Sequence, residues 1–522
     1  MRSAAVLGLD LGTSGIKALL LGEQGTVLGQ GTATYPSRQP QPGWSEQSPD
    51  AWWEAAVAAT RAALSEAERE AGRLDVRGIG LSGQMHTFVL VDAGGRPLRP
   101  AITWMDTRAQ GLLAGAERRI EEAGLAPELA NPVVLSMTLL PLLWLRAHEP
   151  ALLEQANALL VAKDALRARL TGVLCSEPTD ASATLLADVP GRRWSSRLAR
   201  AFELPEGLLP PLVASDAAAG TLLPEAAQAL GLPAGIPVAA GAGDQQAAAV
   251  GMGTLRPGQM QLMVGTGAQV LAVRERAEPD PAGRLHTFCH VHGFVQQASV
   301  NNAGAALDWA RQLLGASWEE VYAAPLDQPH LPAFVPYLTG ERTPLMKGYA
   351  RGAWLGLEPG HDRASLLAAA VVGVITSIAD GVQAVLASGA VEGAVRASGG
   401  GLREPRFAQA VADAIGLPLA LVRRGAASAV GAALLGGVAA GVYPDVDVAA
   451  AQVADDATEP VMPRADAAAL WQARCAWRAA LDERGVHEHV AARPETAVEV
   501  AVEVAVEGTV EAADEVADEP SG

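Results

Sequence analysis

The chain has 522 residues, 49% of them hydrophobic, so it can form two to four domains with large cores. Its formal net charge of −19 argues against a nucleic-acid partner, because no basic stripe is present to replace phosphate counterions. The three cysteines, Cys175, Cys289 and Cys475, lie far apart and form no CxxC pair or disulfide framework, which is typical of a reducing, cytoplasmic environment.

The sequence favours neither a signal peptide nor a membrane-spanning helix. The N-terminus is a poor signal peptide, because Arg2 is its only early base and Asp10 interrupts the apolar stretch. The most membrane-like window, 425–444, carries no charge but consists mostly of Ala and Gly. We expect a buried helix there, packed closely against a neighbour, and therefore a soluble protein without a membrane partner.

The first 160 residues are predicted to form strands followed by a mixture of strands and helices. Short apolar segments at 4–9, 18–21 and 26–30, separated by glycines, predict an antiparallel meander. Ser48, Pro49 and Asp50 are typical of a helix start. Further strands are expected at 76–81 and 88–91, and a helical run around 152–160. The alternation indicates an α/β protein.

A small-residue turn follows the first strand. Gly12 and Gly15 let backbone N–H groups approach a ligand, Thr13 and Ser14 add hydroxyls, and Asp10 precedes them. Such a turn can hold phosphate, with the acid meeting a phosphate-bound Mg²⁺ through water. The alternative is an ordinary hairpin that binds nothing. The glycine spacing matches neither a P-loop nor a dinucleotide fingerprint.

A similar turn at 262–267 places Thr266 253 residues after Thr13, about half the chain. This repeat predicts two similar domains, each with one phosphate turn, joined near a glycine-dotted segment at 241–253 that suits a hinge. From Glu495 onward the chain is Val, Ala and acid, with a glutamate every fourth residue. Like charges at that spacing disfavour a helix, so we expect a disordered acidic tail; the alternative is a docking tail for a basic partner.

Four motifs in order resemble the FGGY carbohydrate kinases of the actin-like ATPase superfamily. They are 10–15 (DLGTSG), 241–245 (GAGDQ), 264–267 (VGTG) and 398–403 (SGGGLR). The resemblance implies two actin-like (ribonuclease H-like) ATPase domains flanking a cleft, arising from internal duplication. Their expected extents are 1–245, with the sugar site and first phosphate turn, and 246–490, with the second turn and adenosine-binding turn. The tail is then 491–522. The implied cofactors are ATP and Mg²⁺, and a homodimer is possible by resemblance alone.

Within the family, segments at 43–47, 83–86, 104–108, 162–164 and 340–344 are similar to those of the xylulokinase branch. This implies ATP-dependent phosphorylation of D-xylulose to D-xylulose 5-phosphate. Two positions depart from the branch: Gln245 stands where Asn is frequent, and Gly267 where Ser is frequent. A sibling kinase for glycerol, ribulose or gluconate stays open, as does, more remotely, a non-kinase actin-like nucleotide switch.

The resemblance assigns Asp244 as the general base. It follows the apolar segment 236–240 between small residues, where a solvated turn acid or helix cap is the alternative. Asp10 is expected to organise Mg²⁺ through water. The expected ATP-binding residues, phosphate side first, are Thr13, Ser14, Lys17, Thr266, Gly304, Asp308, Gly400, Gly401 and Glu404. For Lys17 an exposed strand charge is a serious alternative, as are helix packing for Gly304 and a surface acid for Asp308.

The expected sugar-binding residues are Met85, His86, Gln245, Trp104 and Asp106. Each has a plainer alternative: Met85 in the core, His86 as a satisfied turn histidine, Trp104 buried, and Asp106 paired with Arg108. The cluster of His286, Cys289, His290 and His292 suggests a metal site, since strand alternation puts the three histidines on one face. Its spacing matches no zinc pattern, so we expect no structural metal there.

Overall fold

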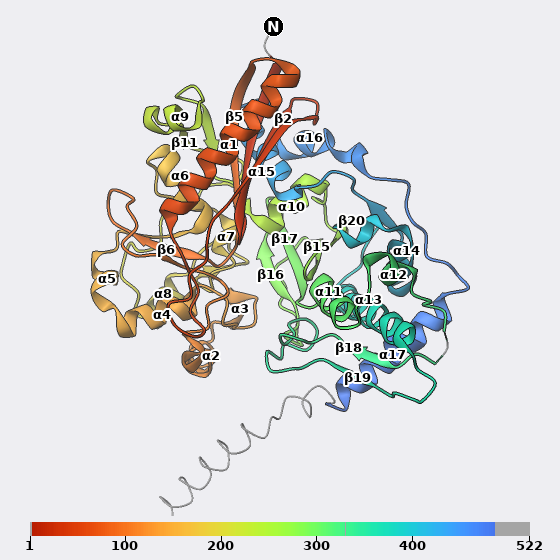
Figure 1. Cartoon of the computed structure of the whole chain (residues 1–522). Coiled ribbons are helices and arrows are strands. Elements are labelled where there is room, and N and C mark those ends of the chain that lie inside the picture. Colours follow the sequence, from red (N-terminus) through yellow and green to blue (C-terminus); the bar gives the residue numbers. More distant parts are fainter. Residues whose placement is uncertain (1–2, 329, 486–522) are drawn as a thin grey trace, which may run out of the picture.

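The computed structural model describes residues 3–328 and 330–485 (Figure 1). The predicted acidic tail at 491–522 lies outside the described residues, as do the last residues of the second expected domain. Two large sheets with helices on their faces occupy the two halves of the chain, which confirms the α/β prediction.

The first sheet begins with the predicted antiparallel meander of β1 (Ser3–Leu11), β2 (Gly15–Gly22) and β3 (Val27–Thr34). β5 (Leu74–Gly83) joins β1 in parallel and completes the centre of the sheet. The remaining strands lie beyond β5: β12 (Pro237–Ala239), β11 (Ala218–Thr221) and the short β13 (Ala242–Gly243). β1, β5 and β13 therefore end at the same edge, where polar side chains follow them.

The predicted helix start at Ser48 is confirmed. α1 (Pro49–Ala71) begins after Ser48, whose hydroxyl accepts from the Ala51 amide at 3.5 Å. Its alanine face packs on β3, where a Cβ at Gly31 would meet the backbone of α1. Small residues on both elements therefore allow the helix and the sheet to approach closely.

The predicted buried helix within 425–444 is also confirmed. α15 (Ala427–Ala439) packs on the other face of the first sheet, beside β1 and β5, as Figure 1 shows for the blue helix next to the red strands. A Cβ at Gly431 would lie 1.8 Å from the Ala247 carbonyl oxygen of α10 (Asp244–Met252). The segment expected as a hinge is thus mostly a buried helix, and Gly431 permits its contact with α15.

The second sheet has the order β16-β17-β15-β14-β20-β21. Its strands are β14 (Met260–Val264), β15 (Ala268–Arg274), β16 (His286–Cys289), β17 (Phe294–Val300), β20 (Val395–Ser398) and β21 (Leu419–Leu421). α13 (Arg363–Ala387) crosses its back. This helix is long and apolar enough to span a membrane, but 83% of its most apolar window is buried inside the protein, as expected of a core helix.

A smaller sheet has the strand order β4-β7-β6-β8, and one of its strands lies where the sequence predicted a helix. The run at 152–160, predicted as helical, is α5 (Pro150–Gln155) followed by β8 (Ala158–Val161), which pairs with β6 (Phe88–Val91). All four residues of β8 are buried. A short apolar run fits a buried strand as well as a helix, so its local pattern could not separate the two.

Shorter elements complete the described chain: β4 (Glu46–Gln47), β7 (Ala101–Ile102), β9 (Ala187–Asp188), β10 (Arg193–Trp194), β18 (Ala333–Val335), β19 (Ala353–Leu355), α2 (Leu113–Glu122), α3 (Ala126–Leu129), α4 (Leu139–His148), α6 (Ala162–Thr171), α7 (Pro178–Ala181), α8 (Ser196–Ala201), α9 (Pro224–Leu230), α11 (Gly304–Leu313), α12 (Trp318–Ala323), α14 (Pro405–Ile415), α16 (Val446–Ala451) and α17 (Ala468–Glu483), with 3₁₀ turns at Gln110–Leu112, Gly401–Arg403 and Ala454–Asp456.

Candidate active site

Two acids meet where parallel strands of the first sheet end. Asp10 lies beside Ser82 in the register of β1 and β5, and Ser82 lies beside Ala242 in the register of β5 and β13. The Ser82 hydroxyl donates to Asp10 Oδ1 at 2.9 Å. Asp244 follows β13 directly and is the first residue of α10. The fold thus brings together two residues that are 234 positions apart.

Burial decides the ionisation of this pair. Desolvation, and then the negative charge of Asp10, raise the pKa of Asp244 to about 7 against hydrogen bonds from Gln245, which lower it. The pKa of Asp10 is also raised by burial, while the Ser82 hydrogen bond and the Lys17 charge lower it. A carboxylate whose pKa lies near neutrality is suited to accept a proton in catalysis.

The first phosphate turn is held in shape by its neighbours. The Gly12 amide donates to the Gly15 carbonyl at 3.0 Å, and Gln47 Nε2 donates to the Thr13 carbonyl at 2.7 Å. Trp104 Nε1 donates to the Thr13 hydroxyl at 3.1 Å. Ser14 and Lys17 are exposed beside this turn. Trp104, predicted at the sugar, therefore also touches the first phosphate turn.

The second phosphate turn opens on a cavity of about 650 Å³. The Gly265 amide donates to the Gly267 carbonyl at 2.8 Å, and the Gly304 amide, at the start of α11, donates to the Gly265 carbonyl at 3.0 Å. Five of the residues predicted to bind ATP line this cavity together: Thr266, Gly304, Asp308, Gly400 and Gly401. Glu404 does not line it. Tyr322 does, and its pKa is raised by burial and in addition by the charge of Glu404.

Aromatic side chains form a wall of this cavity that sequence reasoning missed. Trp309, Trp318, Tyr322 and Phe407 line it, and the rings of Trp318 and Tyr322 stack 5.7 Å apart. The four-residue spacing of Trp318 and Tyr322 places both on one face of a helix, a signal the sequence did contain. An apolar wall facing glycine backbone can accept a planar base.

The turn after β5 lies against Asp244. A Cβ at Gly243 would lie 3.0 Å from Met85 Cγ, so Met85 packs directly on the residue before the acid. His86 has a φ of 68° and contacts the Ala183 carbonyl through Nδ1 at 2.6 Å. Burial lowers its pKa to about 4, so the ring is neutral near pH 7. Gln245 Oε1 is buried with no hydrogen-bond partner within residues 3–328 and 330–485.

The structure does not leave Asp106 free to bind a sugar. Its Oδ1 accepts from the Arg108 backbone amide and Nε, and its Oδ2 accepts from the Ser45 amide and from Arg108 Nη2. The Arg108 guanidinium in turn lies 3.7 Å from the Trp44 ring centroid. Asp106 therefore braces the Trp104 loop from within the protein, as the plainer alternative supposed.

The structure does not bring the side chains of the histidine cluster together as a group of metal ligands. β16 ends at Cys289, and the His290 amide donates to the Gly293 carbonyl in a turn, so the strand alternation assumed for His290 and His292 stops. His290 Nε2 contacts the Thr254 carbonyl instead. Among the described residues, no group of three His, Cys, Asp or Glu side chains could hold a metal ion.

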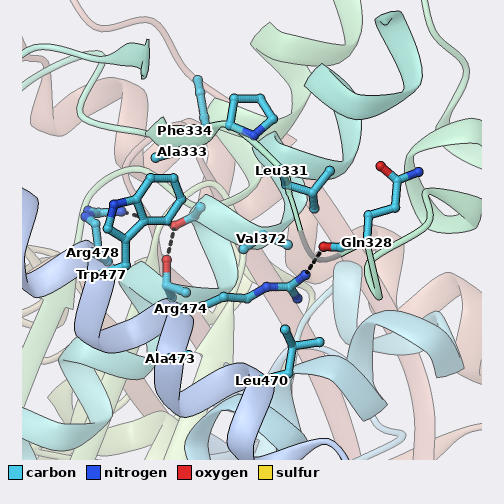
Figure 2. Close-up of a pocket in the computed structure, with 13 residues that line it drawn as sticks. Gln328, Leu331, Ala333, Phe334, Val372, Leu470, Ala473, Arg474, Trp477 and Arg478 are labelled. Atoms are coloured by element: carbon cyan, nitrogen blue, oxygen red, sulfur yellow. Dashed lines mark hydrogen bonds between the residues drawn. The ribbon is translucent and has the colours of Figure 1, made fainter. Parts of the chain in front are cut away.

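A separate cavity of about 170 Å³ lies between α13 and α17, near β18 (Figure 2). Phe334, Val372 and Trp477 line it, and the Arg474 side chain runs along it to donate to the Gln328 carbonyl at 3.2 Å. No predicted site residue lines this cavity. It is therefore distinct from the site at the strand ends.

Comparison with known proteins agrees with this arrangement. Residues 5–251 match the N-terminal domain, and residues 260–440 the C-terminal domain, of the FGGY family of carbohydrate kinases. The chain is 37% identical to the xylulose kinase of Escherichia coli (83% of this chain, 90% of the relative) and 34% to the glycerol kinase of Thermus brockianus (91% and 98%). The crystal structure of a xyloylose kinase from Brucella ovis matches with a TM-score of 0.84 and 34% identity, covering 91% and 98% of the two chains.

The fold and the paired phosphate turns thus define a two-domain, actin-like sugar kinase that uses ATP. The chain belongs to the FGGY family of carbohydrate kinases. This membership confirms the predicted family and fold, and it disfavours the non-kinase nucleotide switch.

Proposed function

We propose that this enzyme transfers the γ-phosphoryl group of ATP to D-xylulose, giving D-xylulose 5-phosphate and ADP. The observation that carries the proposal is the position of Asp244, a partly buried acid with a pKa of about 7, beside Asp10 and against the Met85 turn. Relatives named xylulose kinase support the choice of sugar, since they match most of the chain at 37 and 38% identity.

Asp244 is the proposed general base. A sugar hydroxyl is a poor nucleophile until its proton leaves, and a carboxylate within hydrogen-bond reach takes that proton as the phosphoryl group moves. His86, neutral near pH 7, and Gln245 offer hydrogen-bonding groups for sugar hydroxyls.

Thr13, Ser14, Lys17 and Thr266 are proposed to hold the phosphates, and the 650 Å³ cavity the adenosine. The donor chemistry at Asp10 fits Mg²⁺, which prefers carboxylate oxygens, phosphates and retained waters. When bound, the ion would neutralise phosphate charge. We also propose that the boundary between the two domains lies near residue 245, as the sequence predicts. α15 comes later in the chain than this boundary but packs on the first sheet.

The proposal is tested with the purified enzyme, ATP and a panel of D-xylulose, D- and L-ribulose, gluconate and glycerol, with ADP detected by a coupled assay. We expect the highest kcat/KM for D-xylulose. A specific observation keeps glycerol on the panel: the glycerol kinase relative covers 91% of this chain. Preference for glycerol, ribulose or gluconate would leave the kinase mechanism intact and overturn the sugar.

A further inference from the structure

The second half of the chain supplies side chains next to His86. Phe288, on β16, has its ring centroid 6.1 Å from that of His86, and the His286 ring stacks on Phe288 at 5.6 Å with an interplanar angle of 10°. His286 Nδ1 is buried and has no hydrogen-bond partner in the described part of the chain. A strand of the second sheet therefore lies against the proposed sugar turn of the first half.

Arg342 lies in the same region, in a loop that is hydrogen-bonded to β17. The Thr343 amide donates to the Ser299 carbonyl at 3.0 Å, and the Ser299 amide donates to the Thr343 hydroxyl at 3.2 Å. Arg342 Nε donates to Asn301 Oδ1 at 3.0 Å. The Arg342 guanidinium then lies 5.5 Å from the ring centroid of Trp104, which belongs to the first half.

The Arg342 guanidinium forms no direct ion pair with a carboxylate among the described residues, although against the lowering effect of burial the Glu341 charge acts to raise its pKa. Glu341, its neighbour, accepts from the Asn301 amide through Oε1 and from Asn302 Nδ2 through Oε2. Within those residues only the Nε of the guanidinium is hydrogen-bonded, and the side chain stays partly exposed. Burial lowers the pKa of Arg342, and the pKa values of His86 and His286 are lowered mainly by burial and in addition by the Arg342 charge.

The remaining guanidinium donors of Arg342 are not among the buried atoms without a partner, so they are open to solvent and can exchange water for the acceptors of a ligand. The planar guanidinium of Arg342 can donate two parallel hydrogen bonds to neighbouring oxygens while stacking on Trp104. The oxygens of an open-chain ketose, a carbonyl beside hydroxyls, are such acceptors. Lysine would offer a point charge without the planar fork or the stacking.

We propose that Arg342 is a substrate-binding residue which the second half of the chain contributes to the sugar site, donating hydrogen bonds to ketose oxygens. The inference rests on the proposed function, since it requires a polyol at the Met85–His86 turn. It makes the sugar site a product of both halves of the chain, so that sugar is held fully only when the two halves are together.

The test compares Arg342→Gln and Arg342→Lys with the wild type, using whichever sugar of the panel the wild type phosphorylates best. We expect the KM for sugar to rise at least about tenfold in both variants, as for a lost hydrogen bond from a charged donor. The KM for ATP and the slow hydrolysis of ATP without sugar should stay within about twofold, since phosphate contacts are kept. Arg276→Gln, an exposed arginine of the same half, is the control and should leave all values unchanged.

Two results would overturn the inference. An unchanged sugar KM in Arg342→Gln would show that no sugar contact is lost, and a raised ATP KM with normal sugar binding would assign Arg342 to phosphate. If turnover is too low to measure, calorimetric binding of the sugar to the variant without ATP decides the question, with ADP binding as the check on folding. Wild-type preference for another sugar would refute the xylulose proposal alone and leave the Arg342 test valid.

Discussion

Replacing Asp244 by Asn separates catalysis from stability. Burial raises the pKa of Asp244 from its ordinary 3.8 to about 7, a difference of about 3 units or about 4 kcal/mol. The folded protein thus holds this proton more tightly than the unfolded chain. Stability is therefore lost as the pH rises from about 4 to about 7, and the full penalty applies above 7. Asn cannot ionise, so it escapes this penalty.

We expect Asp244→Asn to be inactive yet more stable than the wild type at pH 8.5 by up to about 4 kcal/mol, and by about 2 kcal/mol less at pH 5.5. In thermal melts this is a rise of about 4 °C at pH 8.5, since the unfolding entropy of so long a chain is about 1 kcal/mol/K. Turnover should fall by about 10²- to 10⁴-fold, the usual contribution of a general base.

The control is Asp466→Asn, which removes an exposed carboxylate of the second half and should change neither quantity. Wild-type kcat/KM should also fall with decreasing pH through about 7, as the base becomes protonated. A stability difference that does not vary with pH, or turnover within tenfold of the wild type, would refute the reasoning.

Three further substitutions test other parts of the structure. Gly400→Val should raise the KM for ATP at least about tenfold and leave sugar binding and melting unchanged, because a Cβ there meets no protein atom within 4 Å but enters the 650 Å³ cavity; a normal ATP KM contradicts the cavity assignment. Gly431→Ala should lower stability by about 1–3 kcal/mol in urea unfolding, because its Cβ would lie 1.8 Å from the Ala247 oxygen; Gly360→Ala, which has open space, is the control. Asp106→Asn should cost about 3–5 kcal/mol of stability, since it breaks a fully buried pair, while the sugar KM of the folded enzyme changes little; a large KM effect at full stability would restore Asp106 as a sugar ligand.

Local signals in the sequence were enough for much of the first sheet. Glycines between apolar runs marked the meander, and Ser48 marked the start of α1, because turns and caps depend on a few neighbouring residues. The same reasoning failed at β8, where a short apolar run is compatible with either element until its partner β6 is known. It failed again after Cys289, where a turn that the alternation rule does not see redirects His290.

The candidate site likewise contains some residues that the sequence could predict and others that depend on contacts between distant parts of the chain. The phosphate turns are recognisable because their chemistry is carried by consecutive residues, and five predicted residues do share one cavity. For Asp106 the sequence left open a sugar contact or a pair with Arg108; the structure shows the pair, together with a hydrogen bond from the Ser45 amide 61 residues away. Arg342 was noted only within a similar segment, since its stacking on Trp104 joins residues 238 positions apart.

The sequence by itself determined the class of this protein: the order of its turns, its acids and its glycines defines a sugar kinase of the FGGY family. Only the tertiary structure decided how those residues work. Burial at the strand ends moves the pKa of Asp244 toward neutrality, and the packing of β16 and the Arg342 loop against His86 and Trp104 brings both halves of the chain to the proposed sugar site. The physical reason is that residue types fix which bonds can form, whereas desolvation and long-range contact depend on what the fold places around them.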